Sequence, residues 1–186
     1  MIIRKASCHD AAPIAACLLL AMEEIIYKLT GLNDRRQAER FLYHFAMKEG
    51  NQYSFENCWV AERGTEVVAA VNVYDGALLR SLRQPILDYL KSEFNRDAQP
   101  EDETAAGEFY IDSLGVKQGY QGKGIGTEML KFLTDEFVTR RHQTLGLLVD
   151  PGNQSARSLY QKLGFRLRDH LTFMGKEMEH LQLEPF

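Results

Sequence analysis

The stretch Gly119-Tyr120-Gln121-Gly122-Lys123-Gly124-Ile125-Gly126-Thr127 decides the fold of this chain. It follows a strand-like run that ends at Val116, and helical periodicity begins within it. Glycine lowers helix stability by roughly 1 kcal/mol per position relative to alanine, so alternate glycines oppose a helix here. A bound phosphate compensates, because bare amides at a helix start point at the anion and the helix dipole favours its charge. The stretch predicts a phosphate site; a plain flexible turn is the alternative.

Two common phosphate loops do not fit this stretch. A nucleotide-hydrolase loop needs Ser or Thr after Gly122-Lys123, where Gly124 stands, and a glycine at Lys117. A dinucleotide fingerprint needs a third glycine where Thr127 stands, and it normally lies in the first strand-helix unit.

Strand and helix patterns alternate along the rest of the chain and predict an α/β fold with a mixed sheet. Strands are expected over Met1–Lys5, Cys58–Glu62, Glu66–Tyr74, Glu108–Val116 and Leu145–Val149, with one or two more within Phe165–Met178. Helices are expected from a cap at Ser7 or Asp10 to a break at Gly31, and over Asp34–Lys48, Leu78–Phe94, Gly124–Arg140 and Asn153–Lys162. Asn95–Glu103 is polar and acidic, so we expect a solvated loop there.

The composition is that of one ordinary globular domain over residues 1–186. Lys plus Arg total 22 against 26 for Asp plus Glu, a formal charge of -4. This balance gives no reason to expect nucleic-acid binding and suits a positively charged partner.

Three cysteines, Cys8, Cys17 and Cys58, form no C-x-x-C pair, which favours a reduced, cytoplasmic setting. The apolar segment Ala11–Met22 is interrupted by Pro13 and is too short to span a bilayer. We interpret it as a buried helix rather than a signal peptide, and we expect no membrane partner.

Two blocks of residues together point to a known family. Gln121, Gly124 and Gly126 match the pattern Gln/Arg-x-x-Gly-x-Gly/Ala after Leu114-Gly115-Val116. The second block reads Asn153, Ala156, Leu159, Tyr160 and then Lys162-Leu163-Gly164-Phe165. Over residues 108–178 the chain resembles the GNAT superfamily of N-acetyltransferases.

The resemblance implies a GNAT-like mixed, mostly antiparallel central sheet of six to seven strands flanked by helices. The chain departs from the family pattern at residues 75–107, where we expect a helical insertion between strands 3 and 4 in place of the tight hairpin that many members have. The insertion carries an apolar helical stripe, which would cover the acceptor site, form a homodimer contact or pack back onto the sheet.

The resemblance further implies acetyl-CoA as co-substrate, with its pyrophosphate on the amides of residues 121–127 and its pantetheine arm along residues 114–116. The arm would lie in a gap between that strand and Leu145–Val149. The implied cofactor-binding residues are Leu114, Gly115, Val116, Gln121, Gly122, Lys123, Gly124, Ile125, Gly126, Thr127, Asn153, Ala156 and Tyr160. Asn153 could equally cap a helix.

Acetyl transfer needs a neutral amine, whereas free alkylamines have pKa values near ~10. Glu108 and Asp112 alternate onto one strand face, together with Tyr110 and Leu114, so either carboxylate could act as base through water. The alternative for each is a solvated or ion-paired carboxylate.

Tyr160 stands where the family often carries its general acid, and its alternative is a packing role. The amide of Val116 would hold the oxyanion. The five histidines show no metal-ligand spacing, so we expect no metal site.

These residues predict an N-acetyltransferase that moves acetyl from acetyl-CoA to a primary amine of a small molecule or peptide by direct attack. A non-catalytic acyl-CoA-binding module and a transferase of another acyl chain are alternatives. Val149-Asp150-Pro151-Gly152-Asn153 stands where ribosomal-protein alanine acetyltransferases show Glu-x-Arg-x-x-Asn, which disfavours acetylation of peptide N-termini. The acceptor would be shaped by Leu29–Asn57 and the insertion.

Overall fold

Seven strands form one sheet in the order β1-β2-β3-β4-β5-β7-β6 in the computed structural model, which describes residues 1–185. All neighbouring strands are antiparallel except the parallel pair β4–β5. The strands are β1 (Ile2–Lys5), β2 (Cys58–Arg63), β3 (Glu66–Asp75), β4 (Phe109–Val116), β5 (Leu145–Val149), β6 (Arg166–Phe173) and β7 (Lys176–Leu183). The predicted α/β class and mostly antiparallel sheet are confirmed, although the last strand ends at Leu183 rather than Met178.

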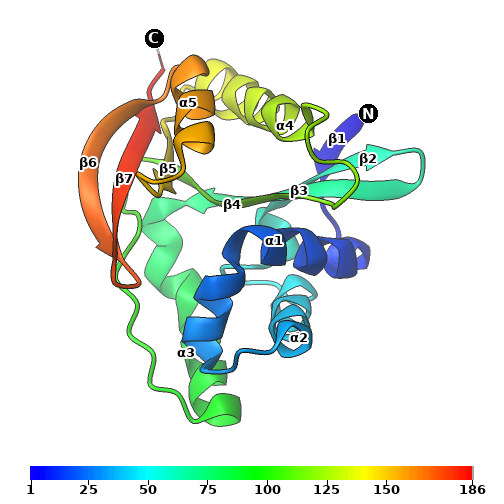
Figure 1. Ribbon diagram of the computed structural model, residues 1–186, viewed down its shortest axis with the longest axis vertical. Helices are drawn as coiled ribbons and strands as arrows, with labels where there is room; N and C mark the ends of the chain where they lie inside the picture. The colour runs from blue at the N-terminus through cyan, green and yellow to red at the C-terminus, as the bar shows by residue number, and fades with distance from the viewer. Residues whose placement is uncertain (186) are drawn as a thin grey trace.

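Helices cover both faces of the sheet (Figure 1). Helices α1 (Ala11–Thr30), α2 (Arg35–Ala46) and α3 (Leu79–Phe94) lie on one face, which we call the α1 face. The other face, the α4 face, carries α4 (Ile125–Leu133), its π-helical continuation Thr134–Arg140 and α5 (Gln154–Lys162). Short 3-10 turns occur at Cys8–Asp10, Phe55–Asn57 and Gly76–Leu78. Each face buries its own apolar cluster.

Local sequence signals account for several helix boundaries. The side chain of Asp34 accepts hydrogen bonds from the amides of Arg36 and Gln37, and α2 therefore starts there. Gly31 ends α1 in the left-handed conformation, with a φ of 73°. Within α1, Met22 departs from helical geometry, so the helix kinks at this residue. None of the helices in residues 1–185 has the length and apolar character needed to cross a membrane.

Strands β4 and β5 separate partway along their length. Their pairing runs from Phe109 opposite Leu145 to Ile111 opposite Leu147, whereas β4 continues to Val116 paired only with β3. One edge of β4 is therefore unpaired beyond Ile111. The separation lies between the two strands where the family resemblance implies a gap.

A β-bulge at Asp112 changes which way the following residues face. Asn72 of β3 lies opposite Ser113 and Val73 lies opposite Ile111, so Asp112 has no partner across the strands. Leu114 packs with the cluster on the α4 face, while a Cβ at Gly115 would overlap the Cys17 carbonyl oxygen of α1. The prediction that Asp112 and Leu114 share a face is wrong, because the extra residue interrupts the alternation.

Candidate active site

The turn between β4 and α4 presents a row of free backbone amides. Gly119, Gly122 and Gly124 all have positive φ, and Gly124 is the N-cap of α4 without a side-chain cap. No oxygen of residues 1–185 accepts a hydrogen bond from the amides of residues 121–127; the next amide, that of Glu128, donates to the Gly124 carbonyl at 3.0 Å. Uncapped amides at the positive end of a helix dipole form an anion-binding site. We call residues 121–127 the amide loop.

The unpaired edge of β4 begins beside the amide loop. Gln121 belongs to both features, because its side-chain amide donates to the Val116 carbonyl at 3.0 Å. An unpaired strand edge can accept an extended ligand as an added strand. The edge and the loop thus offer strand-like hydrogen bonds and anion binding in one continuous path.

Helix α5 borders this path on the α4 face. Its partly buried residues Ala156 and Tyr160 pack against the same cluster as Leu114 and Val116. The side chain of Asn153 accepts a hydrogen bond from the Ala156 amide at 3.1 Å, so Asn153 caps α5. A helix cap is one of the two roles predicted for this residue. Burial raises the pKa of the Tyr160 hydroxyl, which therefore stays protonated near neutral pH and can donate a proton.

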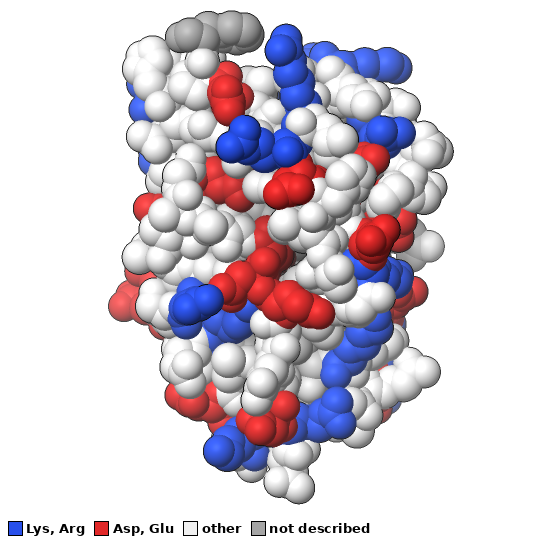
Figure 2. Space-filling model, turned by 90° about the vertical axis from the view of Figure 1, so that its left-hand side faces the viewer, with Lys and Arg blue, Asp and Glu red and all other residues white. Residues whose placement is uncertain are grey.

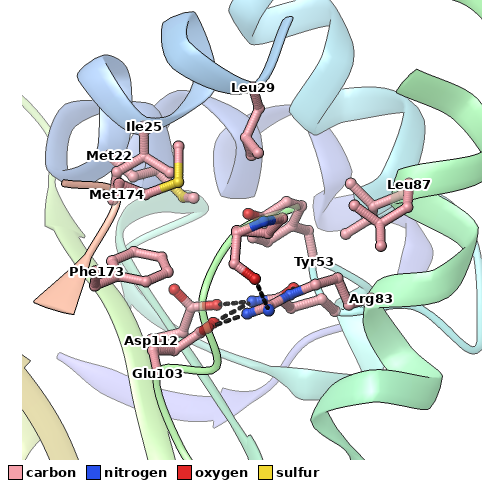
Figure 3. Close-up of a pocket in the computed structure, with 13 residues that line it drawn as sticks. Met22, Ile25, Leu29, Tyr53, Arg83, Leu87, Glu103, Asp112, Phe173 and Met174 are labelled. Carbon is pink, nitrogen blue, oxygen red and sulfur yellow. Dashed lines mark hydrogen bonds and ion pairs between the residues drawn. The ribbon is translucent and has the colours of Figure 1, made fainter. Parts of the chain in front are cut away.

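A narrow cavity lies on the α1 face, where Asp112 projects from the bulge (Figure 3). Its free volume of about 20 Å³ is close to that of one water molecule. Figure 3 shows side chains of α1 and of the β6–β7 turn on one side and the carboxylates of Asp112 and Glu103 on the other. The lining residues are Met22, Ile25, Leu29, Gln52, Tyr53, Arg83, Ile86, Leu87, Pro100, Glu103, Asp112, Phe173 and Met174.

Asp112 has an environment suited to a general base. Gln52 donates to Asp112 Oδ2 and to Glu103 Oε1, each at 2.9 Å. Burial and then the charge of Glu103 raise the pKa of Asp112 to about 7, although the hydrogen bond from Gln52 and the charge of Arg83 oppose the shift. A carboxylate with this pKa exchanges protons near neutral pH.

Glu103 corrects the expectation of a wholly solvated loop over Asn95–Glu103. Its side chain is 2% exposed and forms a salt bridge with Arg83, which is 7% exposed. Arg83 lies on the helix face that also buries Leu79, Ile86 and Leu90. A charge on a buried helix face requires a partner, so Arg83 is the signal in the sequence that could have predicted a buried acid.

Glu108 shares the α1 face with Asp112 but belongs to a different network. Its carboxylate accepts from the Thr104 hydroxyl at 2.6 Å, and it contacts His180 Nε2 at 2.9 Å and Gln182 Nε2 at 2.8 Å. Burial raises the pKa of Glu108, but these three partners together outweigh burial and the net pKa is lowered. Glu108 therefore remains ionised and tied to β7, which disfavours a role as base.

Acidic side chains gather across the middle of the face that carries β6 and β7 (Figure 2). The segment that leads from α3 to β4 lies on the same face. Within residues 1–185 no group of His, Cys, Asp and Glu side chains could hold a metal ion. The negative surface favours the approach of cations.

Sequence comparison finds similarity to known enzymes. A sequence model described as the acetyltransferase (GNAT) family matches residues 24–165. Spermine/spermidine N(1)-acetyltransferase of Bacillus subtilis (strain 168) is 29% identical over 79 residues, which cover 42% of this chain and 52% of that protein. The chain spans about half the length of the curated relatives it matches.

Structure comparison finds similar folds. A crystal structure of an acetyltransferase superposes with a TM-score of 0.81 at 26% identity, covering 99% of each chain. A GNAT family acetyltransferase from Elizabethkingia anophelis with acetyl-CoA bound has a TM-score of 0.58 at 16% identity, covering 98% of this chain and 97% of that one. The second likeness concerns the fold alone.

Proposed function

This chain belongs to the acetyltransferase (GNAT) family, and from that premise we propose that it transfers an acetyl group from acetyl-CoA to a primary amine. The resemblance drawn from the two motif blocks is thereby confirmed, as is the class of acyltransferase at the level of the family. The observation that carries the finer proposal is the amide loop, whose free N–H groups lie at the start of α4.

The amide loop fits the diphosphate of CoA. Gly122, Lys123 and Gly124 are exposed, and both glycines have a positive φ that favours glycine, whose lack of a side chain leaves the backbone open to a ligand. Gln121, Ile125, Gly126 and Thr127 complete the loop. The unpaired edge of β4 over residues 114–116 would hold the pantetheine arm by strand-like hydrogen bonds. These contacts would place the thioester at the gap between β4 and β5.

Asp112 would accept the proton of the amine, directly or through water. An alkylammonium of pKa near ~10 lies roughly 3 pKa units above Asp112, which makes this transfer cost about 4 kcal/mol. From an aspartate at its ordinary pKa the same transfer would cost about 8 kcal/mol. The environment of the bulge therefore makes this proton transfer less costly.

Tyr160 would protonate the departing sulfur. The amine nitrogen forms a bond to the acyl carbon as the carbon–sulfur bond breaks, and the thiolate takes the proton of the tyrosine hydroxyl. Tyr160 packs on the α4 face and Asp112 faces the α1 face. The two groups thus lie on opposite faces of the sheet beside the gap. This arrangement suits an acid and a base that act on opposite sides of the reacting carbonyl.

The acceptor would be a cationic small molecule or peptide amine. Asp112, Glu103 and the acidic surface of Figure 2 favour a positive charge. The departure at Val149–Asn153 from the ribosomal-protein alanine acetyltransferase pattern favours a small molecule over a peptide N-terminus.

Thiol release tests this function. Acetyl-CoA and a panel of primary amines are incubated with the protein and with Tyr160→Phe, and free CoA thiol is followed by a colour reagent. We expect turnover that falls by about 10²-fold or more in Tyr160→Phe, since the leaving group loses its acid. Tyr43→Phe, an exposed site on α2, is the matched control and should keep full activity.

Two other outcomes of the thiol-release assay would favour an acyl-CoA-binding module or a transferase of another acyl chain. CoA binding without thiol release from any amine would overturn the enzyme and favour an acyl-CoA-binding module. Faster release from propionyl- or succinyl-CoA than from acetyl-CoA would overturn the choice of acyl chain.

A further inference from the structure

We propose that the acceptor is an amine with one cationic end and an apolar body, and that Met174 selects this body. The inference rests on the acyl transfer proposed above and names the substrate class of the same site.

The cavity is divided into a charged end and an apolar wall. Asp112 and Glu103 lie at one end, with Arg83 already paired to Glu103. The opposite wall is formed by apolar side chains of α1 and of the β6–β7 hairpin, which are Met22, Ile25, Leu29, Phe173 and Met174 (Figure 3). A ligand complementary to both ends carries a positive charge beside Asp112 and hydrocarbon along the wall.

Met174 is an unfavourable residue for its position in the β6–β7 turn. Phe173 pairs with Lys176, so Met174 and Gly175 form a two-residue hairpin turn, and both have positive φ, at 50° and 77°. Such turns strongly favour Asn-Gly, and methionine in the left-handed region costs on the order of 1 kcal/mol. A side chain that is unfavourable for the turn but lines the cavity points to a role in the cavity.

The turn is also fixed against the two neighbouring walls. The Met174 amide donates to Glu101 Oε2 at 2.9 Å, on the segment that carries Glu103. Lys28 of α1 donates to the Met174 carbonyl at 2.8 Å. These two bonds fix the backbone of Met174 beside the cavity, while its side chain stays free to change rotamer.

Beyond the apolar wall the carboxylates already have partners. Glu24 pairs with Lys176 at 3.1 Å and Glu23 with Arg35 at 2.7 Å. Asp150 accepts from the Gly152 amide at 2.8 Å. A second ammonium group of a polyamine would compete with Lys176 for Glu24 and with Arg35 for Glu23. The cavity therefore favours a single cation with hydrocarbon behind it.

The small free volume of the cavity requires side chains of the apolar wall to move when the acceptor binds. About 20 Å³ does not hold an alkyl chain. Methionine side chains are unbranched and adopt many rotamers at low cost, so Met22 and Met174 can move aside and repack on the ligand.

Acceptor kinetics and a dead-end ligand test the inference. Methylamine, n-hexylamine and spermidine are compared as acceptors, and we expect n-hexylamine to have a KM about tenfold lower than either of the others. Hexyltrimethylammonium, which has no transferable proton, should bind without CoA in calorimetry and compete with n-hexylamine.

Met174→Asn separates a role in the cavity from a role in folding. Asparagine suits the turn, so the melting temperature should be unchanged or higher. The KM of n-hexylamine and the Kd of hexyltrimethylammonium should rise about tenfold, with the KM of methylamine unchanged within about twofold. His142→Asn, at another left-handed residue that does not line the cavity, is the matched control and should leave all three constants unchanged.

Three results would overturn the inference. They are a lower KM for spermidine than for n-hexylamine, absence of hexyltrimethylammonium binding, and equal binding of this probe by Met174→Asn and the parent protein. Because the probe needs no CoA, its binding distinguishes failure of the cavity assignment from failure of acyl transfer.

Discussion

Asp112 is a buried carboxylate that projects from the bulge of β4 into the cavity on the α1 face. Its place on the strand after Tyr110 was enough to select it as a candidate base. Burial and the charge of Glu103 raise its pKa, while the hydrogen bond from Gln52 and the charge of Arg83 oppose this shift, and these three residues come from distant segments. No spacing in the sequence brings these segments together, so the sequence indicates the residue without its chemistry.

The raised pKa of Asp112 predicts that this residue lowers the stability of the protein at neutral pH while it supports activity. Folded protein holds the Asp112 proton more tightly than the unfolded chain, so the free energy of unfolding falls as pH rises from about 4 to about 7. Asp112→Asn removes the charge. We expect it to lower kcat/KM by about 10²-fold or more and to raise the free energy of unfolding by about 1–3 kcal/mol at pH 8, with no gain at pH 4.

Urea denaturation at both pH values checks the stability effect, and the pH 4 measurement serves as the internal control. In the parent enzyme kcat/KM should rise with pH through about 7, as the base loses its proton. A loss of stability in Asp112→Asn at pH 8, or a rate independent of pH across this range, would contradict the assignment of Asp112 as base.

Secondary-structure elements were predictable where their signals are local. The start of α2 at Asp34, the cap of α5 at Asn153 and the helix over Leu79–Phe94 all follow from nearby residues. The bulge in β4 was missed because it is set by pairing with β3, and a one-residue shift reverses the side chains that follow.

The polar, acidic composition of Asn95–Glu103, between α3 and β4, predicts a solvated loop. Its acidic residues differ in burial. Asp97 is exposed, whereas Glu103 is buried against Arg83. Composition describes a segment as a whole. It does not indicate that one of its acids, Glu103, pairs with the buried Arg83.

Glu103→Gln should shift the acid limb of the rate profile. Removing the charge that helps raise the pKa of Asp112 lowers this pKa, so the pH at which kcat/KM reaches half its maximum should fall by about 1 unit. The variant also leaves the buried Arg83 with only its longer ion pair to Asp102, at 3.5 Å, which should cost about 3 kcal/mol of stability.

Rate profiles and denaturation of Glu103→Gln and Asp97→Asn measure both effects. Asp97→Asn, in the same segment but exposed, is the matched control and should change neither quantity. A rate profile that moves to higher pH in Glu103→Gln would contradict the proposed coupling of the two carboxylates.

The proposed donor path runs along the unpaired edge of β4 and is bordered by the α4 face, whereas the proposed acceptor cavity lies on the α1 face. Motif blocks separated by about thirty residues predicted the donor side, since its groups are backbone amides that glycine spacing reveals. The acceptor cavity draws on α1, α3 and the β6–β7 hairpin, and the sequence indicated only two of the regions that shape it. A homodimer stays a prediction, although Leu79, Ile86 and Leu90 of the apolar stripe are buried within the chain.

Nuclear magnetic resonance of the 15N-labelled protein during titration with CoA tests most directly whether the amide loop binds a diphosphate. The amides of residues 121–127 should show the largest shifts and slower hydrogen exchange, while pantetheine, which has no diphosphate, should affect residues 114–116 and leave the loop unchanged. Saturation with CoA while the amides of residues 121–127 keep their shifts and exchange rates would contradict the proposed site, as would the absence of any CoA binding.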